Sequence, residues 1–177
     1  NKLCWHIGNG NHMNAPIFIL AGEASGDLLA SRIMRAINAH YGKYKWVGLG
    51  GDHMTAEGLQ SVGKMHQLSL IGLGDIILNY NALSNFADDL VEYVMQQRPQ
   101  LILTVDAKGF SVQFAARLRR QMRREGWTAP IIHTVAPTVW AWRSYRARKF
   151  ANIFDEIFLL FNFEKKYFSF DNFKKTF

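Results

Sequence analysis

Short apolar runs alternate along the chain with longer segments whose apolar residues recur every three or four positions. The runs are apolar at nearly every position, which is typical of strands that are buried on both faces of a sheet. They predict strands at residues 16–21, 44–49, 101–105, 130–135 and 153–161.

The segments between these runs predict helices. The first is expected to begin at Ser25 as the N-cap, with Asp27 in its first turn. Further helices are expected at 52–57, 74–97 and 109–124. Residues that keep the helical period predict the inward faces: Leu29, Ile33, Ala36 and Ile37 in the first helix, Ile76, Tyr80, Leu83, Ala87, Leu90 and Val94 in the helix at 74–97, and Phe114, Leu118 and Met122 in the last.

This alternation predicts an α/β fold, a Rossmann-like parallel sheet with helices on both faces. Ligands of such sheets bind at the carboxyl ends of the strands. Four loop segments fall at that edge, and we expect them to form one site: 22–27, 48–51, 106–110 and 136–143.

Three parts are expected along the chain: a polar N-terminal tail at 1–15, a Rossmann-like lobe at 16–161 and a C-terminal end at 162–177 rich in Phe and Lys. Eight of the 13 phenylalanines lie between Phe154 and Phe177. This composition favours a last strand followed by a poorly packed tail.

Composition narrows the functional classes. The 177 residues are 49% hydrophobic, which suits one domain with a sizeable core. The formal charge of +7 favours an anionic partner: a phosphorylated substrate, an anionic lipid surface or nucleic acid. Nucleic acid ranks last, because no helix-turn-helix, zinc-finger or aromatic RNA-binding pattern accompanies the charge.

Cysteine and histidine usage adds two expectations. Cys4 is the only cysteine, which excludes an internal disulfide and favours a cytoplasmic setting. The six histidines lack metal-ligand spacing, so no metal site is expected. No apolar run reaches the length of a membrane span, and the first residues do not resemble a secretory signal.

The glycine-containing segment 22–27 carries two carboxylates, Glu23 and Asp27. A glycine turn between a strand and a helix often binds phosphate, but carboxylates repel a pyrophosphate and suit sugar hydroxyls or a helix cap better. A capped turn without ligand is the alternative. The run of glycines at 48–51 allows a ligand to approach the backbone closely, although a tight turn explains it equally well.

A lone carboxylate comes directly after the strand at 101–105. Asp106 can serve there as a general base for a hydroxyl, or as the N-cap of the next helix. Further along, an aromatic and basic loop can stack on a sugar or bind a phosphate, and a packed aromatic corner is the alternative. Its residues are Trp140, Trp142, Arg143, Tyr145 and Arg146.

Two segments each allow two interpretations. Residues 65–78 are apolar, with Asp75 as the one acidic residue, and form either core or a patch that dips into a membrane surface. Five arginines between 117 and 124 form a basic helix face, which is either solvated or lies against anionic lipid.

Several of these segments, in this order, resemble signatures of the lipid-A-disaccharide synthase family, a group of bacterial glycosyltransferases. They are the AGEASGD run at 21–27, the glycines at 48–51 with Met54 and Gly58, the run at 68–73, and the segment ending PTVWAWR at 135–143. The resemblance covers about residues 17–167 and implies the N-terminal lobe of the two-lobed GT-B architecture.

The resemblance also implies a reaction. The family transfers 2,3-diacylglucosamine from its UDP donor to 2,3-diacylglucosamine 1-phosphate, and forms the β-1,6-linked disaccharide 1-phosphate and UDP with inversion. No cofactor is expected. The family works peripherally, at the cytoplasmic face of the bacterial inner membrane.

The same resemblance implies the site residues. Asp106 matches the aspartate that serves as general base. Substrate contacts are expected from Glu23, Ser25, Gly26, Gly50, Gly51, Trp140 and Arg143. Acyl-chain or membrane contacts are expected from Leu68, Leu70, Ile71, Leu73, Ile76 and Ile77.

The chain also departs from the family pattern. Many relatives have a small residue, Pro, an acidic residue, Phe and Asn after the aspartate, whereas residues 107–111 here read AKGFS. The second lobe is missing, so we expect little or no activity of the chain alone and a possible separate C-terminal lobe. The alternative is a non-catalytic Rossmann-like lobe that binds an anionic lipid or a nucleotide.

Overall fold

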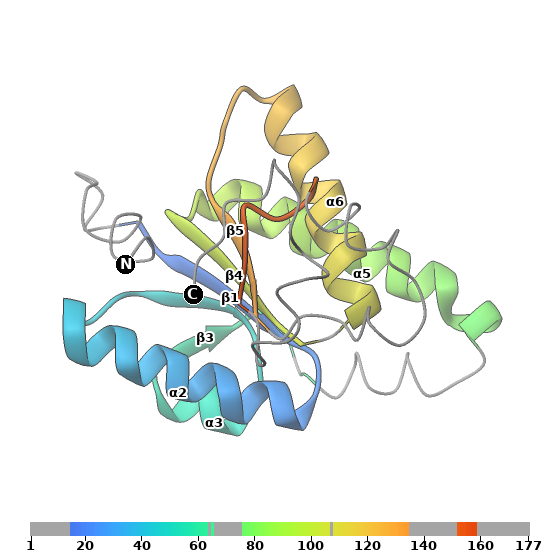
Figure 1. Cartoon of the computed structure of the whole chain (residues 1–177). Helices are drawn as coiled ribbons and strands as arrows, with labels where there is room; N and C mark the ends of the chain where they lie inside the picture. The colour runs from blue at the N-terminus through green and yellow to red at the C-terminus, as the bar shows by residue number, and fades with distance from the viewer. Residues whose placement is uncertain (1–14, 64, 66–75, 107, 135–151, 159–177) are drawn as a thin grey trace, which may run out of the picture.

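The fold is built on a parallel sheet between two layers of helices (Figure 1). The computed structural model describes residues 15–63, 65, 76–106, 108–134 and 152–158. Its strands are β1 (Ile17–Ala21), β2 (Trp46–Leu49), β3 (Leu59–Ser61), β4 (Leu101–Val105), β5 (Ile131–Thr134) and β6 (Glu156–Phe158). The fold class predicted from the sequence is confirmed.

The strand order is β3-β2-β1-β4-β5-β6, and every neighbouring pair is parallel. After β1 the chain adds β2 and β3 on one side and then returns to place β4 on the other side of β1, where Ile17 pairs with both Trp46 and Leu101. The order therefore reverses between β1 and β4. Such a switch point opens a crevice at the carboxyl ends of the strands.

Helices cover both faces of the sheet (Figure 1). On one face lie α2 (Ala24–Tyr41) and α3 (Asp52–Ala56). On the other face lie α5 (Ile76–Gln97) and α6 (Lys108–Arg124). The start of α2 lies against the end of β4 at this switch point.

Each face of the sheet has its own core. Ile17 and Ile19 pack with Met34 of α2, whereas Phe18 and Leu20 pack with residues of α5 and α6. The rings of Phe18 and Phe114 stack with their centroids 5.5 Å apart. All these side chains of β1 are fully buried, and each such burial is worth about 1.5–3 kcal/mol. This explains why the run at β1 is apolar at every position.

The inward faces of the helices agree with most of the predicted positions. Phe114, Leu118 and Met122 of α6 are buried, and so are Ala87, Leu90 and Val94 of α5. The prediction is wrong for Ala36, which is exposed, because α2 is turned so that Ala30, Met34 and Ile37 face the sheet.

The predicted start of α2 is also wrong by two residues. Glu23, not Ser25, occupies the N-cap position, and its side chain makes no capping hydrogen bond. The strand β3 was not predicted, because only Leu59 of its three residues is buried and so no apolar run marks it. Of the strand predicted at 153–161, residues 156–158 form β6, whereas Ile153 and Phe154 are buried ahead of it and 159–161 lie outside the described residues.

The predicted tail at 1–15 lies outside the described residues except for Ala15, and the predicted end at 162–177 lies outside them entirely. Within the described ranges, no helix is both long enough and apolar enough to cross a membrane.

Candidate functional site

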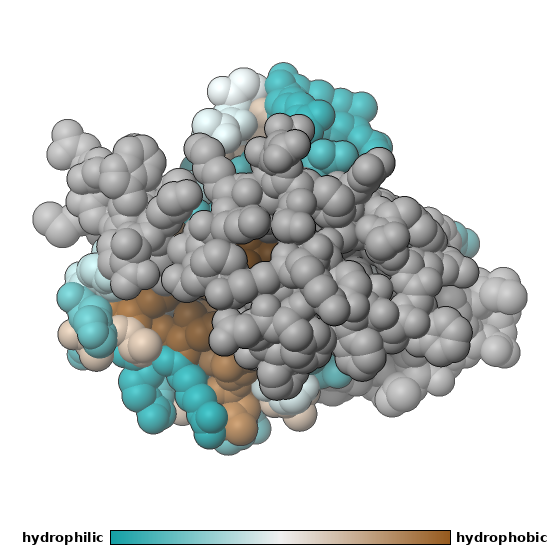
Figure 2. All heavy atoms as spheres, in the orientation of Figure 1, coloured by the Kyte–Doolittle hydropathy of each residue, from teal (hydrophilic) through white to brown (hydrophobic). Residues whose placement is uncertain are grey.

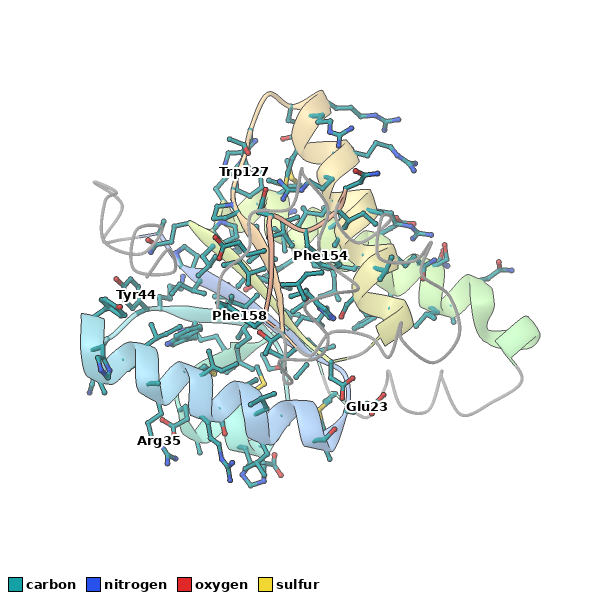
Figure 3. All side chains as sticks on the ribbon, viewed as in Figure 1. Glu23, Arg35, Tyr44, Trp127, Phe154 and Phe158 are labelled. Carbon is teal, nitrogen blue, oxygen red and sulfur yellow. The ribbon has the colours of Figure 1, made fainter. Side chains whose placement is uncertain are left out.

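The first turn of α2 brings three loop segments together at the switch point. A Cβ on Gly26 would stand 3.2 Å from the carbonyl oxygen of Val105 and 3.5 Å from the Cβ of Asp106. This glycine therefore lets α2 start directly against the end of β4. Figure 3 shows Glu23 at the turn from β1 into α2, at the carboxyl edge of the sheet. The predicted convergence of these loops is present for the segments after β1, β2 and β4.

Asp106 lies at the centre of this edge. The hydroxyl of Ser25 donates to its Oδ2 over 3.4 Å. Its other oxygen, Oδ1, is buried and has no hydrogen-bond partner in the described part of the chain. The carboxylate thus stands beside the start of α2 with acceptor capacity to spare, which is what a proton acceptor needs.

The backbone of Asp106 is held in an uncommon conformation. Its φ is 55°, in the left-handed region that aspartate tolerates better than most residues. The Asp106 N–H donates to the carbonyl of Thr134 over 3.1 Å, and the hydroxyl of Ser111 donates to the Asp106 carbonyl over 2.8 Å. Strained residues held by their surroundings in this way cluster at functional sites.

The alternative interpretation of Asp106 as an N-cap finds no support. A cap would accept an N–H from the first turn of α6. No hydrogen bond joins the Asp106 carboxylate to the N–H of Gly109 or Phe110, and Ser25 is its one hydrogen-bond donor among the described residues.

Asp27 has a different environment. The residue is only 3% exposed, and its carboxylate accepts three backbone N–H groups from the start of α3. Oδ1 accepts from Gly51 at 2.9 Å and from Met54 at 3.1 Å, and Oδ2 accepts from His53 at 3.1 Å. Asp27 does lie in the first turn of α2, as predicted, but its carboxylate caps a second helix.

The glycines after β2 are placed by packing. Gly50 is buried, and a Cβ there would stand 2.3 Å from the sulfur of Met54. Gly51 is half-buried, and a Cβ there would stand 2.6 Å from Oδ2 of Asp27. Of the predicted substrate contacts, Gly26 and Gly50 are buried, whereas Glu23 and Ser25 are exposed at the edge.

The other predicted site residues are not placed. Trp140 and Arg143 lie outside the described residues, and so do the predicted acyl-chain contacts Leu68, Leu70, Ile71 and Leu73. Ile76 and Ile77 form the first turn of α5.

Sequence reasoning missed the contacts that hold the site in place. Ser111 lies in a helical segment and Thr134 ends a strand, and nothing local shows that both bond to the backbone of Asp106. Asp27 and Gly51 are 24 positions apart, so their contact has no signature in the sequence.

The basic helix face divides into two groups. Arg117 bonds to Ser84 and Asp88 of α5, and Arg119 bonds to Asp155 and to the carbonyls of Ala129 and Ile153. The other three arginines, Arg120, Arg123 and Arg124, are exposed. Figure 2 shows a hydrophilic surface over the far end of α6, which lies at the amino ends of the strands and away from Asp106.

A cavity of about 310 Å³ opens at that same far end. Its lining includes Arg119, Arg123, Trp127, Asn152 and Asp155. None of the predicted site residues lines it. Its lining comes from the end of α6 and from the segments that precede β5 and β6, so the cavity and Asp106 lie at opposite edges of the sheet.

Two pKa shifts lie away from the edge. Burial raises the pKa of Tyr93 on α5, and the hydrogen bond to Glu57 raises the pKa of Arg35 on α2. No group of three or more His, Cys, Asp or Glu residues that could hold a metal ion occurs within the described ranges.

Comparisons with known proteins agree with this picture. The profile of the family described as lipid-A-disaccharide synthetase matches residues 17–177. The lipid-A-disaccharide synthase of Rhodospirillum centenum is 40% identical over 153 residues, which are 86% of this chain and 37% of that protein.

Two further relatives carry the same name. That of Granulibacter bethesdensis is 37% identical and that of Haemophilus influenzae 30% identical, each over 158 residues that cover 89% of this chain and 39% of the relative. The chain thus spans well under half the length of the curated relatives it matches. On the family profile and on these relatives, the chain belongs to the lipid-A-disaccharide synthase family.

Proposed function

We propose that this chain is the acceptor-side lobe of a two-lobed lipid-A-disaccharide synthase with Asp106 as its general base. One observation carries the proposal. The Asp106 carboxylate lies at the β1–β4 switch point, and its buried Oδ1 accepts no hydrogen bond from any described residue. The proposed reaction transfers 2,3-diacylglucosamine from UDP to 2,3-diacylglucosamine 1-phosphate.

In the proposed step, the 6-hydroxyl oxygen of the acceptor attacks the anomeric carbon of the donor sugar. The bond from that carbon to the UDP oxygen breaks, UDP leaves with the electron pair, and the configuration at the carbon inverts. Asp106 accepts the hydroxyl proton as the new bond forms. A positioned base of this kind contributes roughly 10²–10⁴-fold to the rate.

Neighbouring groups complete the acceptor side. Glu23 and Ser25 are exposed beside Asp106 and have acceptor and donor atoms that suit sugar hydroxyls. Trp140 and Arg143, carried over from the family resemblance, are proposed to contact the sugar ring and the acceptor phosphate. The proposed step needs no cofactor.

The acylated substrates lead us to propose peripheral action at the inner face of the bacterial inner membrane. Leu68, Leu70, Ile71, Leu73, Ile76 and Ile77 are the proposed contacts with acyl chains or lipid. Cosedimentation with anionic liposomes at rising salt tests this, because charge attraction is screened by salt whereas apolar insertion persists. Release of all protein by moderate salt would contradict apolar contact.

The donor lobe is proposed to come from sequence beyond the part that this chain matches. A test joins this chain to the part of the Rhodospirillum centenum synthase on the C-terminal side of the matched region, here called the two-lobed protein. With both substrates in mixed micelles, we expect disaccharide 1-phosphate and UDP in equal amounts. The 177-residue chain alone should give little or no product, and the intact Rhodospirillum centenum enzyme is the positive control.

Two outcomes contradict the proposal in different ways. Robust turnover by the 177 residues alone would refute the need for a second lobe. A folded two-lobed protein that forms no product, while the chain still binds the acceptor, would favour the non-catalytic lobe that binds an anionic lipid or nucleotide.

A further inference from the structure

We propose that Asp27 is a positioning residue, which fixes the glycine turn after β2 against the first turn of α2 so that both loops meet the acceptor sugar as one rigid surface. The part of this inference that concerns the sugar rests on the proposed function. The part that concerns the loops does not.

Both oxygens of the Asp27 carboxylate accept hydrogen bonds. Asp27 is 3% exposed, and the N–H groups of Gly51, His53 and Met54 all point at its two oxygens over 2.9–3.1 Å. A carboxylate with three such donors has no role in proton transfer from a sugar. A buried carboxylate is costly to desolvate, so its retention on this turn needs the three charge-assisted bonds.

The turn after β2 rests directly on this carboxylate. Gly51 approaches so closely that a Cβ there would stand 2.6 Å from Oδ2 and 2.9 Å from Cγ of Asp27. One turn of α2 carries this contact and the contact of Ser25 with Asp106. The first turn of α2 therefore connects the end of β2 to the end of β4.

A ligand at this edge would meet loops whose spacing α2 sets. Ser25 and Asp27 are two positions apart at the start of α2, with Gly26 packed on the end of β4 between them. A sugar that contacts Ser25, Asp106 and the backbone at Gly51 would touch the ends of three strands. Loss of the Asp27 contact frees the Gly51 end alone and leaves Asp106 in place.

The experiment compares Asp27→Ala and Asp27→Asn with Asp89→Ala, a matched control that removes an exposed aspartate from α5. Hydrogen exchange in this chain is measured by NMR. We expect amide exchange at Gly51, His53 and Met54 to rise at least tenfold in Asp27→Ala. The rise should be smaller in Asp27→Asn, whose remaining carbonyl oxygen still accepts from Gly51 and Met54. The amide chemical shift of Leu103 in β4 should be unchanged and serves as the reference for an intact fold. Its exchange rate reports global unfolding and measures the stability lost in each variant.

The second readout is affinity for 2,3-diacylglucosamine 1-phosphate in mixed micelles. Asp27→Ala should weaken binding at least tenfold, Asp27→Asn less, and Asp89→Ala by under twofold. In the two-lobed protein the same ranking should appear in KM, with kcat within about threefold. A merely structural role would lower the melting temperature and leave affinity unchanged well below it.

Gly51→Ala tests the same contact from its other partner and keeps the carboxylate. We expect it to raise exchange at His53 and Met54 and to weaken acceptor binding in the same direction. If Asp27→Ala does not fold, Gly51→Ala tests whether the contact between Asp27 and Gly51 positions the turn after β2.

The outcomes separate the two claims. Unchanged exchange at Gly51, His53 and Met54 in the Asp27 variants would overturn the anchoring. Faster exchange with unchanged acceptor affinity would overturn the positioning role. A wild-type chain that does not bind the acceptor would refute the proposed function and with it the positioning role, while the exchange data would still decide the anchoring.

Discussion

Two carboxylates at the same edge of the sheet have opposite surroundings. Asp27 is buried and accepts three backbone N–H groups, whereas Asp106 is half-buried, accepts one long hydrogen bond from Ser25 and keeps a buried oxygen without a partner among the described residues. A carboxylate that accepts several backbone N–H groups holds loops together. A buried oxygen without a partner costs stability, and such costs cluster at functional sites.

The backbones of Asp27 and Asp106 differ in a corresponding way. Asp27 lies in a regular helix, and its side chain bonds to a neighbouring loop. Asp106 has a φ of 55°, and its N–H and carbonyl are held by Thr134 and Ser111. At Asp27 the side chain fixes its neighbours, whereas at Asp106 the neighbours fix the backbone and leave the side chain available.

The largest expected effect separates the two residues by activity. Asp106→Asn in the two-lobed protein should lower kcat by roughly 10²–10⁴-fold, because the amide cannot accept the proton. Its melting temperature should stay within a few degrees of wild type. Product formation from the two glycolipids measures the first and thermal unfolding the second. Retained turnover would show that Asp106 is not the base, and the proposed difference in role between Asp106 and Asp27 would be wrong.

The next largest expected effect is a difference in stability between variants of Asp27 and of Asp106. Asp27→Ala should lower the free energy of unfolding of this chain by about 2–4 kcal/mol, since three N–H groups lose a charged partner. Asp106→Asn should change it by less than about 1 kcal/mol, because asparagine tolerates the left-handed backbone and still accepts the hydrogen bond from Ser25. Urea titrations of both variants measure the difference, and equal losses would contradict it.

A smaller effect is expected at Ser111, whose fully buried hydroxyl bonds to the Asp106 carbonyl. Ser111→Ala should cost about 1 kcal/mol of stability, since one neutral hydrogen bond is lost. Ser111→Ala should also lower kcat severalfold in the two-lobed protein without raising KM, because the Asp106 carboxylate is then held less firmly in its orientation. Ser111→Thr, which keeps the hydroxyl, is the control. A change in KM alone would contradict a role of Ser111 in positioning Asp106.

The smallest effect on stability is expected at Ser25. Its hydrogen bond to Asp106 is exposed and 3.4 Å long, so Ser25→Ala should change the free energy of unfolding by less than about 0.5 kcal/mol. Acceptor affinity should fall more than stability if Ser25 contacts the sugar. A large stability loss with unchanged affinity would instead make Ser25 part of the scaffold.

Much of this fold could be predicted because its strands are buried on both faces. The uninterrupted apolar runs at β1, β4 and β5 marked them within one or two residues. The edge strand β3 gave no such signal, because water covers most of it and its side chains Gln60 and Ser61 are exposed. The start of α2 was misplaced because Glu23 takes the N-cap position without a capping hydrogen bond.

By itself the sequence determined the fold class, the edge at which the candidate site residues gather and the family. All three depend on local patterns: apolar runs, glycine turns and short motifs. Only the tertiary structure decided which partners each carboxylate has. Two aspartates in similar loop-to-helix segments differ in the partners that the fold brings to them, and those partners lie 24 to 81 positions away along the chain. The number of hydrogen bonds that a carboxylate accepts depends on its three-dimensional neighbours, and no local pattern in the chain encodes it.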